Sequence, residues 1–182
     1  AYRCWGTGVQ RAGPAMAGTP IAAAARAVTW MLGEWVVRQR PSLLGLCSGL
    51  VAGLVAITPA AGFVTPGSAL VIGGVAGLAC YWGATGLKRL LQADDTLDVF
   101  GVHGIGGIVG SLLTGVLASP LISGTHGSLA TQALATLSVL IYGAVMSAVL
   151  LIVIRKFMGL RVDETAEQTG LDISQHRERI GT

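Results

Sequence analysis

The chain has 182 residues, of which 52% are hydrophobic and only 12% charged, and its mean hydropathy is +0.68. A soluble domain carries about 25% charged residues. This chain has too few of them to cover a surface that faces water, so its composition excludes a soluble domain and is typical of a membrane protein. The net charge of +3 comes from short basic clusters between apolar runs, which argues against nucleic acid as a partner.

Residues 1–18 form the least regular part of the sequence. They show no sustained helical or strand period, and they lack the long apolar region of a signal peptide. We therefore interpret them as a divergent N-terminal segment that precedes a membrane region, residues 19–158.

Five apolar runs follow, and each is predicted to cross the lipid bilayer as a helix. The expected spans are residues 21–37, 42–60, 67–87, 98–118 and 129–157. About 20 apolar residues cross roughly 30 Å of hydrocarbon, and the last run is long enough to do so with tilt. The sequence thus predicts an all-α polytopic membrane protein with five transmembrane helices.

Glycine repeats within these runs predict where helices touch. Small residues recur at spacings of four at Gly45, Gly49 and Gly53, at Gly73 and Gly77, at Gly106 and Gly110, and at Gly143 and Ser147. Small residues let helix backbones approach closely where lipid provides no hydrophobic drive for association. Close packing is the simplest explanation of most of them.

The connecting segments predict the orientation of the chain. Lysine and arginine follow the first, third and fifth runs, whereas segments 61–66 and 119–128 contain neither. Because positively charged loops stay in the cytoplasm, we expect the tail, residues 159–182, to be cytoplasmic, in a protein assigned to the cell (inner) membrane. Thr125 is then expected outside and Thr169 inside.

The fourth run is rich in glycine and contains the one histidine of the five runs, His103. An ionisable group at membrane depth is costly to bury and is a candidate functional residue. On a regular helix one face holds Val99, His103, Gly106 or Gly107, and Gly110. We expect His103 to face the bundle interior, either as a hydrogen-bonded packing residue or as a pore or relay group.

Other polar residues have simpler explanations. Asp98 stands where a helix N-cap is expected, and Asp94 and Asp95 come just before it, so capping is the ordinary interpretation and a metal or partner site the alternative. Arg26 lies among alanines without an obvious partner and must reach the interface, face a polar cavity or mark a defect. The cysteines show no metal or disulfide spacing, and nothing indicates a cofactor or catalysis.

Five motifs together carry a resemblance to a known family. In chain order they are residues 30–35 (WMLGEW), 41–45 (PSLLG), 53–60 (GLVAITPA), 98–104 (DVFGVHG) and 159–162 (GLRV). In this order they resemble the C-terminal half of the ammonium transporter (Amt/Mep/Rh) family, over roughly residues 19–182.

The resemblance implies an eleven-helix bundle of two inverted halves, of which this chain matches the last five helices and the tail. It also implies a homotrimer with a pore for ammonium or ammonia in each subunit, and a tail on which a PII-type signal protein acts. His103 resembles the second of the family's paired pore histidines, and Val99 would line the conduction path. Ser48, Val51 and Thr58, on a neighbouring helix, are weaker candidates.

The sequence also departs from the family pattern. The first half is absent, and with it the other pore histidine, the phenylalanine gate and the outer recruitment site. Arg11 and Arg26 stand where small or apolar residues are usual. We expect a partial chain and keep two functions open. One is a transporter subunit that needs the rest of its pore, and the other is a non-conducting membrane fragment or interaction module.

Overall fold

The computed structural model describes residues 2–92, 94–95, 97–124 and 126–178, with side chains from residue 11 onward. All the secondary-structure elements assigned in these residues are helices, which confirms the predicted all-α class. The chain divides into two units, unit 1 up to Thr136 and unit 2 from Leu137.

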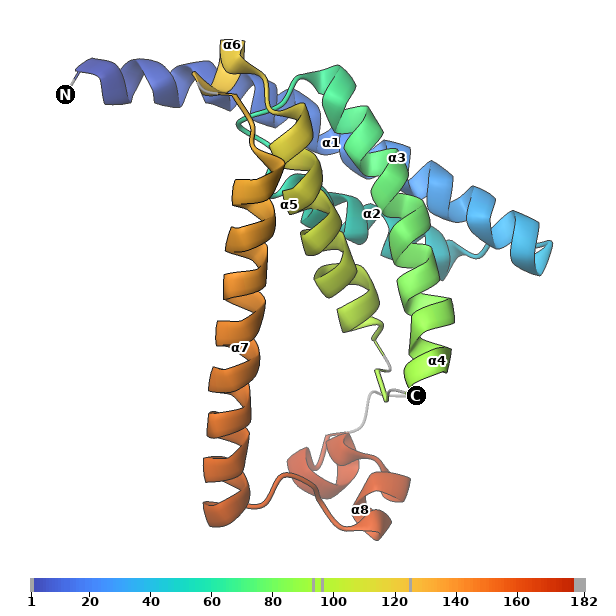
Figure 1. The fold of residues 1–182 in the computed structure, drawn as a ribbon. Helices are drawn as coiled ribbons and strands as arrows, with labels where there is room; N and C mark the ends of the chain where they lie inside the picture. The colour runs from blue at the N-terminus through green and yellow to red at the C-terminus, as the bar shows by residue number, and fades with distance from the viewer. Residues whose placement is uncertain (1, 93, 96, 125, 179–182) are drawn as a thin grey trace. The chain divides into compact units, whose positions relative to one another are not determined.

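Unit 1 contains four long helices and several short ones. Its elements are α1 (Tyr2–Arg38), α2 (Leu43–Ile57), α3 (Pro66–Trp82), η1 (Gly83–Leu87), α4 (Lys88–Leu91), η2 (Phe100–Gly104), α5 (Ile105–Leu117), α6 (Pro120–Ser123) and the first turns of α7 (Leu129–Phe157). α1 contacts both α2 and α3, and α5 contacts α2 and α3 (Figure 1). Thr125, expected on the outer side, lies outside the described residues.

α1 begins far earlier than the predicted first span. The helix starts at Tyr2 and continues through Pro14 and Pro20, although each proline removes a backbone donor from the helix. The irregular pattern of residues 1–18 therefore does not correspond to an irregular backbone. Tertiary contact explains part of this, because most helical stability in proteins comes from packing and α1 also contacts α6.

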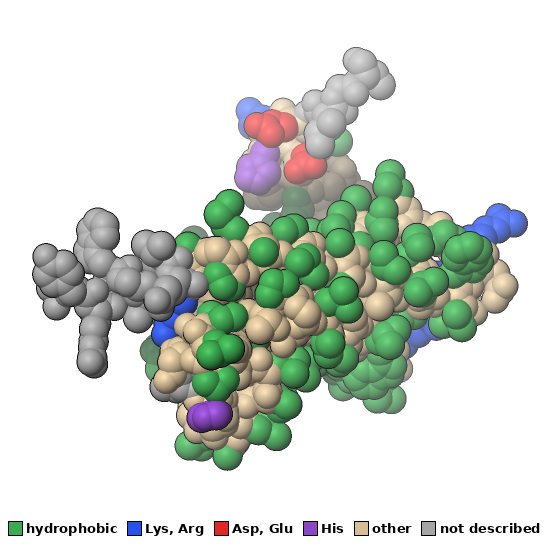
Figure 2. Space-filling view, turned by 90° about the horizontal axis from the view of Figure 1, so that it is seen from above, with side chains coloured by type: hydrophobic (Ala, Val, Ile, Leu, Met, Phe, Trp, Pro, Cys, Tyr) green, Lys and Arg blue, Asp and Glu red, His purple; other side chains and the backbone are tan. Residues whose placement is uncertain are grey.

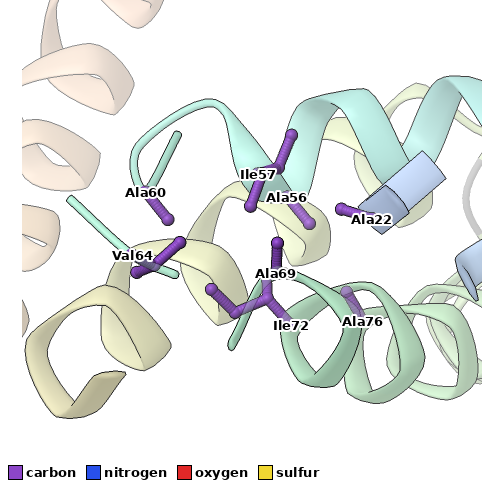
Figure 3. Packing of buried hydrophobic residues seen from close by; sticks show 8 residues of the cluster. All are labelled: Ala22, Ala56, Ile57, Ala60, Val64, Ala69, Ile72 and Ala76. Atoms are coloured by element: carbon purple, nitrogen blue, oxygen red, sulfur yellow. The ribbon is translucent and has the colours of Figure 1, made fainter. Parts of the chain in front are cut away.

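Small side chains form the core between α1, α2 and α3. The cluster consists of Ala22, Ala56, Ile57, Ala60, Val64, Ala69, Ile72 and Ala76 (Figure 3). A Cβ atom at Gly53 would lie 2.5 Å from Ala23 Cα, and one at Gly110 would overlap the backbone of Ala56. The glycine ridges in unit 1 thus mark close helix contacts, as the sequence predicts.

Three helical stretches are long and apolar enough to cross a membrane. They are Pro66–Leu91, Phe100–Leu117 and Leu129–Phe157. α2 is apolar but has 15 residues, a length of about 22 Å at 1.5 Å per residue. α1 is not among the three, and Arg26 interrupts its most apolar stretch. Figure 2 shows many hydrophobic side chains spread across the viewed face and few charged ones.

Unit 2 consists of the rest of α7 and the tail. The side chains of α7 are not buried, so its apolar surface is free to contact lipid or other helices. The tail forms α8 (Glu164–Thr169) and η3 (Asp172–His176). Arg161 binds Glu167 through Nε–Oε1 at 2.5 Å and Nη2–Oε2 at 2.9 Å. These hydrogen bonds lower the pKa of the Glu167 carboxyl.

Candidate pore-lining face

His103 lies in η2, a single π-helical turn that leads directly into α5. The backbone N–H of Ile105 donates to the carbonyl of Phe100, five residues earlier, in place of the four-residue step of an α-helix. Such a turn contains one residue more than an α-helical turn and is often found at functional sites. Neither the apolar pattern nor the glycine content of the sequence indicates it.

The π turn changes which residues share a face of the helix. Val102, Gly106 and Gly110 are buried, whereas Val99 and His103 are exposed. In the described chain His103 therefore does not share the buried face of Gly106 and Gly110, and its orientation toward the interior of a complete bundle stays a prediction. One additional residue rotates the preceding side chains by about 100° relative to the rest of the helix.

The surroundings of His103 are open. No hydrogen bond or ion pair of its side chain occurs among the described residues. Val99, one turn away, is 52% exposed. A Cβ atom added at Gly107 would meet nothing within 4 Å. The imidazole thus stands on a sparsely covered apolar face of unit 1.

Of the three weaker candidates, Ser48 and Val51 lie on α2 and Thr58 is its C-cap residue, and α2 contacts η2 and α5. Val51 is 48% exposed, and Thr58 is also exposed. The Thr58 hydroxyl donates to the carbonyl of Leu54 at 2.7 Å, so its proton is used within the helix. Ser48 is half-buried and lines a hollow of about 310 Å³ between α1, α2 and the end of the α3–α4 helix.

That hollow adjoins the junction of the first two motifs of the resemblance. Glu34 is only 3% exposed, and its carboxylate accepts hydrogen bonds from the Ser42 N–H at 2.9 Å and the Ser42 hydroxyl at 3.1 Å. Arg38 pairs with it at 3.5 Å. A Cβ atom at Gly45 would overlap this carboxylate. The first two motifs, WMLGEW and PSLLG, therefore contact each other in the structure. Their Glu34, Ser42 and Gly45 together form the junction between α1 and α2.

The three acidic residues before η2 do not share one role. Asp95 caps the helix, since its carboxylate accepts from the N–H of Val99 at 2.8 Å and of Phe100 at 2.9 Å. Asp98 instead pairs with Lys88 at 2.8 Å, and its backbone has φ +53°. Capping by the Asp98 side chain is therefore wrong, and a left-handed backbone is tolerated there because Asp is short and polar. Asp94 is exposed.

No group of three or more His, Cys, Asp or Glu side chains in the described part of the chain is placed to hold a metal ion. Asp95 stabilises the start of the helix, and Asp98 connects it to α4 through Lys88.

Arg26 is completely buried in unit 1. Its Nη1 donates to the carbonyl of Ala52 on α2, while Nε and Nη2 have no hydrogen-bond partner among the described residues. A Cβ atom at Gly106 would lie 3.3 Å from this Nη1 and 3.4 Å from Cys80 Sγ. The guanidinium thus neither reaches the interface nor faces a polar cavity, and it remains incompletely paired between four helices.

Arg11, the other departure from the family pattern, has a structural role. Its Nη2 donates to the carbonyl of Ser123 at 3.0 Å, and its guanidinium carbon lies 4.9 Å from the centre of the Phe63 ring. Both contacts hold the early part of α1 against segments more than 50 residues away. Cation–π contacts of this kind contribute roughly 0.5–1 kcal/mol at exposed sites.

The chain is similar to transport proteins over nearly its whole length. The ammonium transporter family model matches residues 5–180. The ammonium transporter of Aquifex aeolicus is 42% identical over 172 residues, covering 91% of this chain and 40% of that protein. The crystal structure of Saccharomyces cerevisiae Mep2 superposes with a TM-score of 0.79 at 35% identity, over 85% of this chain and 38% of that one. A sensor Amt protein gives a TM-score of 0.82 at 28% identity, over 91% and 42%.

These helices and matches define a membrane-embedded, multi-pass protein of a transporter class. The chain belongs to the ammonium transporter family. It spans about 40% of the length of the curated relatives it matches. The family match begins at residue 5 and so includes most of the segment that the sequence pattern sets apart.

Proposed function

We propose that this chain forms part of a pore for ammonium or ammonia, as the portion of a transporter subunit that contributes one pore imidazole. The observation that carries the proposal is the exposed apolar face with His103 and Val99, in a chain that matches the ammonium transporter family from residue 5 to 180.

The chemistry of such a face suits this substrate. Ammonium is a strongly hydrated cation, so moving it unpaired through a narrow dry path is very unfavourable. Neutral ammonia crosses an apolar path more easily once its proton has been removed. An imidazole can donate or accept a hydrogen bond there and can relay a proton, because its two nitrogens have different roles. His103 is the imidazole of this chain that is placed in an apolar helix.

The rest of the pore must come from outside the described face. Val99, Val51 and His103 are exposed, so further helices have to cover them before they enclose a path. The relatives are longer than this chain, and we propose that helices corresponding to their additional segments provide that cover. The full assembly is a homotrimer in the inner membrane, with the tail cytoplasmic and available to a PII-type signal protein. The distribution of lysine and arginine supports this orientation.

A second candidate is a non-conducting membrane module. Arg26 favours it, because a buried and incompletely paired positive charge between α1, α2, α3 and α5 repels cations in the bundle. Such a module would keep the helix contacts and the folded tail without moving substrate.

A chimera separates the two functions. This chain would replace the matching segment of the Aquifex aeolicus transporter, and ammonium uptake would be followed by stopped-flow pH change in liposomes. We expect transport that falls at least tenfold in His103→Ala and is unchanged in the tail variant His176→Ala. A chimera that inserts and assembles but stays silent, also with Arg26→Ala, would leave the non-conducting module as the function.

A further inference from the structure

Two π-helical turns lie against each other in unit 1. η1 interrupts the helix formed by α3 and α4, and η2 begins the helix that carries His103. The two turns meet at Gly83 and Gly101. A Cβ atom at Gly101 would lie 2.6 Å from the backbone N of Ala84 and 2.7 Å from its Cα. Both contacts are with backbone atoms, so no side chain can move aside.

The register of η2 follows from this contact. Counting back from buried Gly106 in α-helical steps of three or four reaches His103 and Val102, and next Val99. Gly101 is five residues from Gly106, and in a regular α-helix it would point away from them. In the structure Gly101 is buried and His103 exposed, as the extra residue of a π turn requires.

We propose that Gly101 is a positioning residue that acts through His103. Its bare Cα allows η2 to pack on η1, and the π turn held by this packing directs the His103 imidazole to the exposed face that it shares with Val99. The inference rests on the proposed function, in which this face borders the conduction path.

The substitution Gly101→Ala tests this proposal. Its added methyl group would clash with the backbone of Ala84, and one change of the helix removes this clash while the helices stay packed. If η2 returns to the α-helical register, residue 101 rotates outward and the clash with Ala84 disappears. The same rotation turns Val99 and His103 toward the buried face of Gly106, while Val102, four residues before Gly106, stays on that face. Gly107→Ala is the matched control, since its added methyl meets nothing within 4 Å.

The direction of these side chains can be measured on the whole chain in detergent micelles. Dissolved oxygen, which enters apolar surroundings, speeds the NMR relaxation of exposed valine methyl groups and of the His103 ring. In the native chain we expect the effect at Val99 to exceed that at Val102 severalfold, because their exposures are 52% and 5%. In Gly101→Ala the effects at Val99 and at the His103 ring should both fall severalfold, while the effect at Val102 should stay low. Gly107→Ala should leave both unchanged.

Two results would overturn the inference. One is an unchanged effect at Val99 and at the His103 ring in Gly101→Ala. The other is a rise at Val102 without a fall at Val99, which is the sign of a loosened bundle in place of a rotated helix. The measurement reports side-chain direction and not transport. A failed transport assay would therefore contradict the proposed function and leave this result standing.

Discussion

Arg26 places a positive charge where four helices otherwise meet through alanine, glycine and cysteine. Of its three guanidinium nitrogens, only Nη1 has a partner, the carbonyl of Ala52. Leaving a buried charge without adequate compensation is strongly unfavourable, and hydrophobic replacements of similar volume are often neutral or more stable. The side chain is thus a local conflict in a well-packed core.

We expect Arg26→Met to stabilise unit 1 by about 1–4 kcal/mol, because methionine has a similar length and needs no hydrogen bonds. Thermal unfolding of the chain in detergent, followed by circular dichroism, measures the change. Arg89→Met at an exposed position is the control and should have little effect. A lower unfolding temperature for Arg26→Met than for the native chain would show that the guanidinium is better compensated than its contacts indicate.

At the scale of single elements, the start of η2 depends on one carboxylate. Asp95 accepts from the N–H groups of both Val99 and Phe100, two donors that have no partner within the helix. Asp95→Ala should therefore destabilise the chain by about 0.5–2 kcal/mol. It should also speed hydrogen exchange at these two amides.

Asp94→Ala, at the exposed neighbouring carboxylate, is the control for Asp95→Ala and should leave the exchange of both amides unchanged. Equal effects of the two substitutions would mean that general negative charge, and not the Asp95 cap, stabilises the helix start.

The sequence predicts the helices better than it predicts their faces. Apolar runs and glycine ridges indicate the long helices and their close packing, because composition and spacing are local properties. The direction of His103 does not follow from them, since an α-helical period assigns it to the face of Gly106. The π turn that moves it depends on the contact of Gly101 with Ala84, which lies 17 positions earlier in the sequence. A contact at that separation leaves no periodic signal.

The N-terminal part of α1 was missed for a related reason. Residues 2–18 contain Pro14, are closely followed by Pro20 and show no regular period, yet they are helical. Arg11 contacts the Ser123 carbonyl and the Phe63 ring, and neither partner can be inferred from the residues around Arg11. The Asp95 cap is within reach of sequence reasoning, because capping is predicted for the three aspartates before the helix, whereas the pairing of Asp98 with Lys88 is not.

At the scale of the whole molecule, apolar surface outside the packed core is the dominant property. The α7 side chains are all unburied, and the face with Val99 and His103 is uncovered. When the helices insert into a bilayer, lipid can cover this apolar surface, because lipid contacts apolar side chains as favourably as protein does. Such insertion does not by itself enclose a path. Membrane insertion and pore formation are therefore separate events for this chain.

We accordingly expect that the chain alone, reconstituted in liposomes, does not raise ammonia permeation above that of lipid without protein. A path needs walls on all sides, whereas the exposed face provides one wall and one imidazole. Arg26 acts in the same direction, because a charge at a helix centre costs roughly 2.5–3.5 kcal/mol on insertion scales and weakens the insertion of α1. Stopped-flow recording of internal pH after an ammonium jump measures permeation, and empty liposomes set the background. A fast alkalinisation that disappears in His103→Ala but persists in His176→Ala would contradict this expectation. It would mean that copies of the chain associate through the His103 face and enclose a conducting path among themselves.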